Sequence, residues 1–339
     1  MAPEAPARSL VKPGPRLAVS RGLITVTVAL LVLVVAGAVF APTSIQKGTL
    51  LGMLPFAAVL VIVALGQTLV VQQGGIDLSV PGAVSLAVVV VTHQPKGDDD
   101  KLLLAAVLAL GIAVLAGVGN GILIGRFGLN PIVATLGMNA LLYAGVLGIS
   151  GGSPRRTTRR LASIADGTTF GVPNAVYFAV AAVVIVTVAV KWTVAGRRFE
   201  AVGANPSAAW ATGLKVTRHK FGAYIWAQVL YWLAGVLLAG ILAQPTAFQG
   251  DAYLLPSVAA VVLGGTSLLG GRGYLVATAV AALFLSQLEQ FVLALGVTFA
   301  VRTLVEAAAL AVGVALYTVD WQALRERFVG GAAQPATSP

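Results

Sequence analysis

The sequence has very little of what a disulfide, a metal site or a water-soluble surface requires. Its 339 residues include no cysteine and two histidines, His93 and His219, which lie far apart. The lack of cysteine excludes disulfides and thiolate metal ligands, and two distant histidines do not predict a metal centre. Charged residues make up 10% of the chain, whereas soluble globular proteins carry roughly 25%. So few charges cannot cover a soluble body of this size, and we expect most of the surface to face lipid.

Signatures of nucleotide and nucleic-acid chemistry are also missing. The dipeptide Gly-Lys does not occur, which excludes the phosphate-binding pattern G-x-x-x-x-G-K-[ST] and makes the glycine-rich stretch 264–273 a flexible turn. The net charge of +10 is not accompanied by a basic, aromatic-studded face, so no nucleic-acid partner is predicted. No nucleophile, metal set or acid–base pair is expected to converge at one depth, so the chain is not predicted to be an enzyme.

What the sequence does contain is a series of long apolar runs. A helix that crosses a bilayer needs about 20 mostly apolar residues, and the first run exceeds the roughly 7–15 residues of a signal-peptide core. We therefore predict an all-α polytopic membrane protein. The third and eighth runs are short and could be broken or re-entrant, which requires cover from protein or a cavity. The expected spans are 22–40, 49–71, 79–93, 102–125, 131–149, 173–191, 221–243, 254–269, 274–295 and 300–318.

The distribution of Lys and Arg predicts the orientation. Ten spans place both termini on one side, and with the termini in the cytoplasm the inner segments hold 14 of the 22 basic residues, as the positive-inside rule requires. The expected organisation is a cytoplasmic tail over 1–20, a membrane domain over 21–320 with a cytoplasmic loop over 196–220, and a cytoplasmic tail over 321–339. One outer loop departs from the rule, so it either has a special partner, which we favour, or the span count is wrong. Its basic residues are Arg155, Arg156, Arg159 and Arg160.

A weak internal repeat supports a transporter plan. The pattern Gly75-x5-Pro81 before the third span recurs as Gly250-x5-Pro256 before the eighth. A unit of five spans makes the second copy inverted, with the pathway at the interface between copies. Chance similarity between apolar segments is the alternative.

The strongest local motif is GGIDLSVPG at 74–82. Gly74 and Gly75 permit backbone angles closed to other residues. Asp77 or Ser79 can cap the next helix, and Pro81 fits its first turn. The motif is either a simple tight turn with a cap or a helix N-terminus exposed beside a translocation pathway. We assign the pathway to Gly74, Gly75, Asp77, Ser79, Thr135 and Asn139.

The hydrophilic stretch GRRFEAVGANPSAAWATGLKVTRHK at 196–220 contains a short predicted surface helix, Ser207–Thr212, bounded by helix breakers. A plain connector would not need such a helix, whereas a docking site for a cytoplasmic partner would.

Four motifs in order, GGIDLSVPG, PIVATLGMNALLYAG, GRRFEAVGANPSAAWATGLKV and GGTSLLGGRG, resemble the ribose/xylose-type permeases of ABC importers, over residues 50 to 318. The resemblance implies a ten-helix fold of the vitamin-B12-importer kind. It also implies a second permease copy, identical or paralogous, an extracytoplasmic solute-binding protein and separate cytoplasmic ATPase subunits, which would hold the ATP and Mg²⁺. This chain itself would hold no cofactor. The residues that it places against the ATPase are Gly203, Asn205, Ala208, Ala209 and Gly213.

Several residues depart from that family's usual pattern. Pro81 replaces a more usual Gly, and Glu289, Arg302 and Glu306 stand where Asn, Gln and Lys are usual. Charged side chains inside spans are costly and are functional candidates, although these three could form a structural ion-pair cluster. Other polar residues within spans are expected to form interhelical hydrogen bonds or to contact solute: Gln67, Asn120, Thr135, Asn139, Gln228 and Gln287.

We therefore predict the permease subunit of an ABC importer for a small sugar-like solute in the bacterial cytoplasmic membrane, working by alternating access. The four loop arginines would capture an acidic surface of the binding protein or, alternatively, sit at lipid phosphates. The competing interpretations are import of another polar solute such as an amino acid or nucleoside, an ion-coupled secondary transporter, and an intramembrane enzyme.

Overall fold

A computed structural model describes residues 21–298, 300–301, 304–305, 307–308 and 311. It consists of helices and one short hairpin, in which β1 (Thr168–Thr169) pairs antiparallel with β2 (Val172–Pro173). The α-helices are α1 (Arg21–Phe40), α2 (Lys47–Gln72), α3 (Val80–His93), α4 (Leu102–Gly121), α5 (Pro131–Ser150), α6 (Arg159–Ala165), α7 (Asn174–Trp192), α8 (Val194–Ala204), α9 (Pro206–Ala211), α10 (Val216–Ile241), α11 (Leu254–Leu263) and α12 (Leu275–Ala294). Short turns of helix are η1 (Pro42–Ile45), η2 (Asp99–Lys101), η3 (Ile122–Arg126) and η4 (Gln249–Tyr253).

Seven helices in the described part of the chain are long and apolar enough to cross a membrane: α1, α2, α4 with its flanking turns, α5, α7, α10 and α12. This confirms a polytopic, helical membrane protein but not ten complete spans. The expected third and eighth spans form α3 and α11, which have 14 and 10 residues. The tenth expected span, 300–318, lies mostly outside the described residues. Arg302, Glu306 and the tails 1–20 and 321–339 lie wholly outside them.

The two short helices lie beside each other at their irregular N-terminal ends. A Cβ atom on Gly250 would lie 2.1 Å from the carbonyl oxygen of Pro81, and the Gly250 N–H donates a hydrogen bond to Ser85 Oγ at 2.9 Å. The two copies of the Gly-x5-Pro pattern therefore meet in space. Non-helical backbone is tolerated at membrane depth only where protein covers it, and each copy helps to cover the other.

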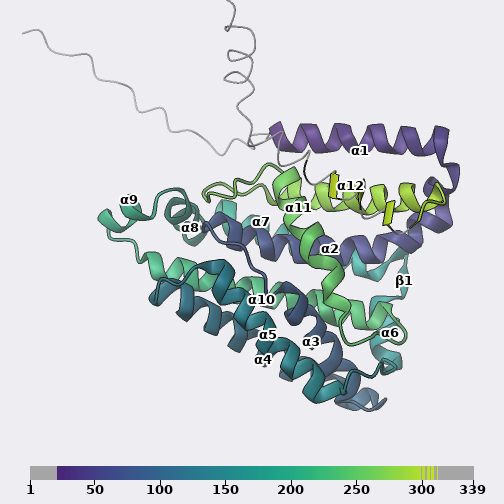
Figure 1. Ribbon diagram of the computed structural model, residues 1–339, viewed down its shortest axis with the longest axis horizontal. Helices are drawn as coiled ribbons and strands as arrows, with labels where there is room; N and C mark the ends of the chain where they lie inside the picture. The colour runs from purple at the N-terminus through teal and green to yellow at the C-terminus, as the bar shows by residue number, and fades with distance from the viewer. Residues whose placement is uncertain (1–20, 299, 302–303, 306, 309–310, 312–339) are drawn as a thin grey trace, which may run out of the picture.

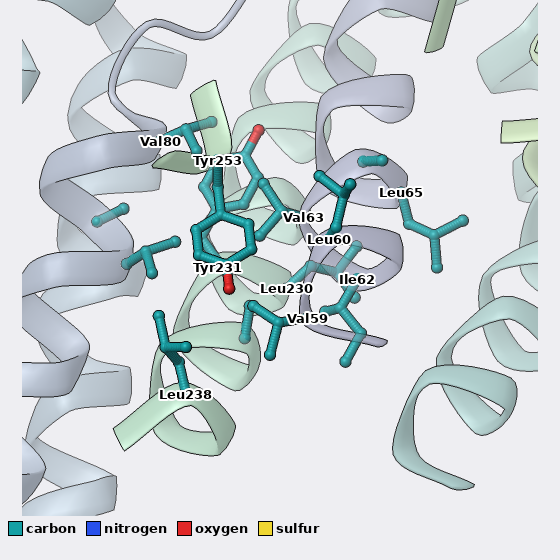
Figure 2. Packing of buried hydrophobic residues seen from close by; sticks show 14 of the residues in the cluster. Val59, Leu60, Ile62, Val63, Leu65, Val80, Leu230, Tyr231, Leu238 and Tyr253 are labelled. Atoms are coloured by element: carbon teal, nitrogen blue, oxygen red, sulfur yellow. The ribbon is translucent and has the colours of Figure 1, made fainter. Parts of the chain in front are cut away.

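The core lies between α2 and α10, which have no polar face along most of their length and are therefore suited to a buried position. In each, 61% of the most apolar window is buried, against 17% in α1, so α2 and α10 are central and α1 is peripheral. Figure 2 shows Val59, Ile62 and Val63 of α2 beside Tyr231 of α10. Close approach depends on Gly66, where a Cβ would lie 2.6 Å from the Tyr231 ring, because small residues let membrane helices pack tightly.

The helix ends gather at two opposite ends of the molecule (Figure 1). At the first, here named the α9 end, Gly22 packs against Gly264. At the second, named the α6 end, the Thr157 N–H donates to the Ala243 carbonyl at 3.2 Å. Each of these two contacts joins parts of the chain that the predicted order of spans places near the same side of the membrane.

The hydrophilic stretch 196–220 is more helical than predicted. The expected short helix exists as α9, Pro206–Ala211, but α8 extends to Ala204 and α10 begins at Val216 instead of 221. The prediction treated polar residues as a break in structure, whereas here they continue helices beyond their apolar parts. Figure 1 shows α8 and α9 projecting at the α9 end.

Candidate functional site

The connection between α2 and α3 begins with a tight turn that requires glycine. The N–H groups of Gly74 and Gly75 donate to the carbonyls of Val71 and Val70, at 2.9 and 3.2 Å. Gly74 has a φ of +76°, and a Cβ on Gly75 would lie 2.5 Å from the Tyr224 hydroxyl. The predicted need for an unusual backbone angle is confirmed at Gly74, whereas Gly75 has no positive φ and is required for space instead.

Asp77 is fully buried directly after this turn. One carboxylate oxygen accepts hydrogen bonds from the backbone N–H of Ser79, at 2.8 Å, and from its hydroxyl. The side-chain amide of Gln67 lies against the backbone of Asp77. In the amide orientation that satisfies both of its atoms, its oxygen accepts from the Asp77 N–H at 3.2 Å and its nitrogen donates to the Asp77 carbonyl at 3.3 Å. Asp77 is thus held by its backbone and by one carboxylate oxygen before α3 begins.

The hydroxyl of Ser79 joins three helices. It donates to Asp77 and accepts from Asn120 Nδ2 of α4 at 3.2 Å and from Gln228 Nε2 of α10 at 2.8 Å. One oxygen on each of Asp77, Asn120 and Gln228 has no hydrogen-bond partner in the described part of the chain. The cluster therefore retains acceptors that a hydroxyl donor could use.

α5 covers the start of α3. The helix N-terminus is therefore not exposed, in contrast to the interpretation that placed it open beside a pathway. The Leu78 N–H donates to Thr135 Oγ1 at 2.9 Å, and the Gly82 N–H donates to Asn139 Oδ1 at 2.8 Å. Ser79 occupies the N-cap position but its side chain makes no capping bond. A side chain from a neighbouring helix supplies the cap, so the sequence motif alone could not reveal it. Pro81 lies in the first turn of α3, as expected.

The predicted pathway residues therefore converge, but most are sealed in the isolated chain. Gly75, Asp77, Ser79 and Thr135 are buried and Asn139 is half-buried. Gly74 is exposed and lines a pocket of about 220 Å³ at the α9 end, with Gln73, Asn130, Lys220 and Tyr224 among its other walls.

The five residues predicted to dock on an ATPase have different structural roles. Asn205 Oδ1 caps α9 by accepting from the Ala208 N–H at 3.0 Å, and Gly213, with a φ of +84°, ends the turn after it. Ala209 faces inward and Gly203 is buried against α2. Ala208 is exposed. The prediction missed Trp210, which is 74% exposed beside Ala208.

The four predicted arginines gather at the α6 end and are exposed. Arg155 donates to the His93 carbonyl at 3.4 Å, and the backbone N–H of Arg160 donates to the Asp99 carboxylate at 2.9 Å. The nearby Asp98 is paired with Lys101, whose hydrogen bond lowers the pKa of that carboxyl. Within the described residues none of the four arginines forms an ion pair, so their charge is available to a partner.

The other polar residues within spans form interhelical hydrogen bonds, which was the first alternative. Gln287 of α12 donates to the Ser44 carbonyl at 3.4 Å. The amide of Gln67 bonds to the Tyr231 hydroxyl of α10 at 3.1 Å, and Asn120 and Gln228 bond to Ser79 as described above. Sequence reasoning missed Gln73, whose Nε2 donates to the Phe199 carbonyl at 2.9 Å. The sequence signal that could have identified Gln73 is its position directly before the GGIDLS motif. Glu289 lies in α12, while its expected partners Arg302 and Glu306 are outside the described residues.

Comparison with known proteins agrees with this architecture. The family described as "Branched-chain amino acid transport system / permease component" matches residues 49–319. The ribose import permease protein RbsC of Bacillus subtilis is 35% identical over 274 residues, which cover 79% of this chain and 84% of that protein. RbsC of Escherichia coli K12 is 34% identical over 290 residues, covering 83% and 88%. The fructose import permease protein FruF of Bifidobacterium longum is 31% identical over 262 residues, covering 74% and 72%. No solved structure matches the chain.

The match spans most of the sequence and includes the GGIDLSVPG connection, the α8–α9 element and the loop before α12. It confirms the resemblance carried by the four motifs and the expectation of a transport subunit that is not an enzyme. The chain therefore belongs to this permease family, the membrane-spanning subunits of ABC importers.

Proposed function

We propose that this chain carries a small sugar across the bacterial cytoplasmic membrane as the permease subunit of an ABC importer. The observation that supports this most strongly is the likeness to ribose and fructose import permeases over about three quarters or more of the chain. The unpartnered acceptors of Asp77, Asn120 and Gln228 suit a solute with several hydroxyl groups. The chain breaks no covalent bond, because its task is to change which side its pathway faces.

The α9 end would face the cytoplasm and receive the ATPase. This orientation puts both termini inside and follows the excess of Lys and Arg in the inner segments. The docking surface would be the outer face of α9, formed by Ala208 and Trp210, while Asn205, Ala209 and Gly213 hold α9 in shape. ATP and Mg²⁺ would bind to the ATPase and not to this chain.

The complete permease would contain ten helices in a vitamin-B12-importer-like fold, with residues 300–318 as the tenth and two inverted five-helix units. The contact between Gly250 and Pro81 supports such a repeat, since it brings the two copies of the Gly-x5-Pro pattern together, the first residue of one copy against the last residue of the other. Two permease copies, identical or paralogous, would enclose the pathway. Gly74, Gly75, Asp77, Ser79, Thr135 and Asn139 would control it by moving between open and sealed arrangements.

At the opposite end, the exposed arginines would attract an acidic surface of the extracytoplasmic binding protein. Complementary charge of this kind raises the rate of association and restricts the choice of partner more than it raises affinity. Arg155, Arg156, Arg159 and Arg160 form the proposed surface.

The experiment is co-purification of the tagged chain with its ATPase, followed by ATP hydrolysis in nanodiscs. We expect a stable complex whose hydrolysis rises when binding protein loaded with ribose or fructose is added. A chain that purifies alone and transports in response to a sodium or proton gradient would overturn the proposal in favour of a secondary transporter. Stimulation by a binding protein loaded only with an amino acid or nucleoside would keep the ABC assignment and reject the sugar.

A further inference from the structure

Three chain segments meet on the carbonyl oxygen of Gln72, the last residue of α2. The N–H of Gly271, in the loop before α12, donates to it at 2.9 Å. From α8, a Cβ on Gly203 would lie 2.0 Å from the same oxygen, and a Cβ on Gly270 would lie 2.9 Å from the Gly203 carbonyl. No Cβ fits at Gly203 or Gly270 without movement of the backbone, so α8, α2 and the loop are in direct backbone contact.

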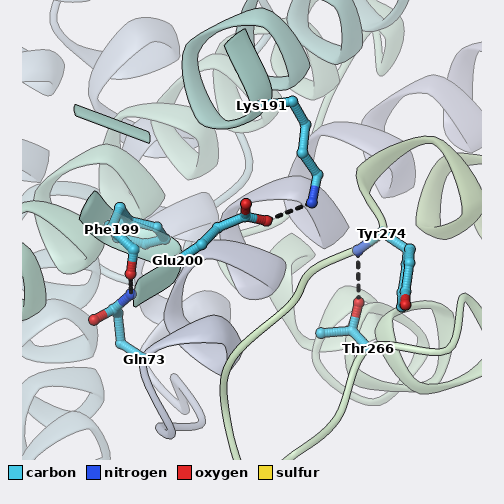
Figure 3. A network of polar contacts seen from close by, with 6 residues as sticks. All are labelled: Gln73, Lys191, Phe199, Glu200, Thr266 and Tyr274. Atoms are coloured by element: carbon cyan, nitrogen blue, oxygen red, sulfur yellow. Dashed lines mark hydrogen bonds and ion pairs between the residues drawn. The ribbon is translucent and has the colours of Figure 1, made fainter. Parts of the chain in front are cut away.

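Side chains strengthen this junction (Figure 3). Gln73 Nε2 donates to the Phe199 carbonyl of α8 at 2.9 Å. Glu200, the next residue of α8, forms an ion pair with Lys191 at the end of α7. Lys191 also lies 5.9 Å from the ring centroid of Tyr274, the residue before α12, and the Tyr274 N–H donates to Thr266 Oγ1 at 3.1 Å. The loop 264–273 is thus held at both of its ends.

The path from Gln72 to the buried cluster is short and pinned along its length. Gly74 and Gly75 are bonded back to the last turn of α2, and only four residues separate Gln72 from Asp77. The Leu78 N–H is held by Thr135 of α5 at 2.9 Å. A displacement of Gln72 cannot be absorbed by slack in this segment.

We propose that α8, the end of α2 and the loop 264–273 move as one rigid body, and that Gln72–Gly74 passes the displacement of α8–α9 to the Asp77–Ser79 cluster. This rests on the proposed function, because the ATPase supplies the displacement. Gly203 and Gln73 are positioning residues: they touch neither solute nor nucleotide, but keep α8 fixed to α2. The loop 264–273, which has no phosphate-binding motif, acts as the clamp that prevents α8 from sliding.

The chain allows a direct test because it has no cysteine of its own. A Cβ on Gly271 would lie 3.8 Å from the Cβ of Ala204, the usual separation in a disulfide. In the double variant Ala204→Cys/Gly271→Cys, assembled with ATPase and binding protein in proteoliposomes, we expect ribose uptake per ATP to agree within about twofold between the oxidised and reduced states. Reversible arrest on oxidation, by tenfold or more, would show that α8 slides against the loop and would overturn the proposal.

Gly271 has a φ of +99°, so a cysteine there is strained, and comparing two redox states of one variant removes this effect. If the double variant is inactive in both redox states, the variant Gly203→Ala tests the proposal instead. Gly222→Ala is its control, because a Cβ on Gly222 would meet nothing within 4 Å. Gly203→Ala is expected to lower uptake per ATP at least tenfold while ATPase binding stays within about twofold of the original. Unchanged uptake per ATP would overturn the proposal, whereas a permease that never binds an ATPase would instead contradict the proposed function.

Discussion

The carboxylate of Asp77 and the hydroxyl of Ser79, two residues apart, form a buried hydrogen bond on which α3, α4 and α10 converge. Ser79 uses its full capacity there, donating once and accepting twice. Removing the Ser79 hydroxyl would leave the side-chain N–H groups of Asn120 and Gln228 without the acceptor that they share.

Ser79→Ala should therefore destabilise the protein and impair transport. An unsatisfied buried polar group costs about 1–3 kcal/mol, and two amides are affected. Thermal unfolding of the purified chain in detergent measures the loss. Ser153→Ala, at an exposed position near the α6 end, serves as control and should leave the Tm unchanged. Equal Tm values for the two variants would show that the cluster contributes nothing to stability.

Gly250→Ala tests the contact between the two repeat motifs. A Cβ at 2.1 Å from the Pro81 carbonyl oxygen forces backbone movement, and overpacking of this kind costs about 1–3 kcal/mol. Gly111→Ala is the matched control, because a Cβ at that helical position meets nothing within 4 Å. Unfolding in detergent should begin at a lower temperature for Gly250→Ala alone. A Tm as high as that of the control would mean that the contact can be loosened without cost.

Two exposed aromatic residues at opposite ends test the ATPase docking surface. Trp210 on α9 is 74% exposed and Phe170 in the β1–β2 turn is 97% exposed. Trp210→Ala should weaken ATPase binding by about 2 kcal/mol, as expected for a tryptophan at the centre of an interface. Phe170→Ala should not alter this affinity. Titration of the ATPase onto nanodisc-embedded permease measures it, and the opposite ranking would place the cytoplasmic side at the α6 end.

Replacing Arg155, Arg156, Arg159 and Arg160 with Ser should slow capture of the binding protein. The rate should fall about tenfold at low salt and little at high salt, because salt screens exposed charges. Stopped-flow association with permease in neutral-lipid nanodiscs gives the rates. Arg197→Ser/Arg198→Ser, at the α9 end, is the control. Equal association rates at every salt concentration would remove the docking role and favour contact with lipid phosphates.

Hydropathy predicted the membrane helices well because apolar length is a local property. The shortness of α3 and α11 and the helix α9 also followed from local signals. The burial of Asp77 and Ser79 could not be predicted, since it depends on three distant helices: Asn120 and Gln228 bond to Ser79, and Thr135 and Asn139 bond to the neighbouring backbone. The burial of Ala209 could not be predicted for a related reason: the side of α9 that packs inward depends on its tertiary contacts.

The boundaries of polar segments were the weakest part of the prediction. α10 begins at Val216 because Thr217, Arg218 and Lys220 extend the helix beyond its apolar part, and composition does not distinguish such an extension from a loop. The role of Gln73 also depends on a distant carbonyl, that of Phe199.

Uptake of radiolabelled ribose into proteoliposomes tests the central claim most directly. The vesicles contain this chain with its ATPase and receive binding protein on the side opposite the ATPase. The account predicts that ribose accumulates only when ATP is present on the ATPase side and the binding protein is supplied, and that collapsing the ion gradients changes nothing. Accumulation without ATP, driven by a sodium or proton gradient across vesicles that contain this chain alone, would contradict it.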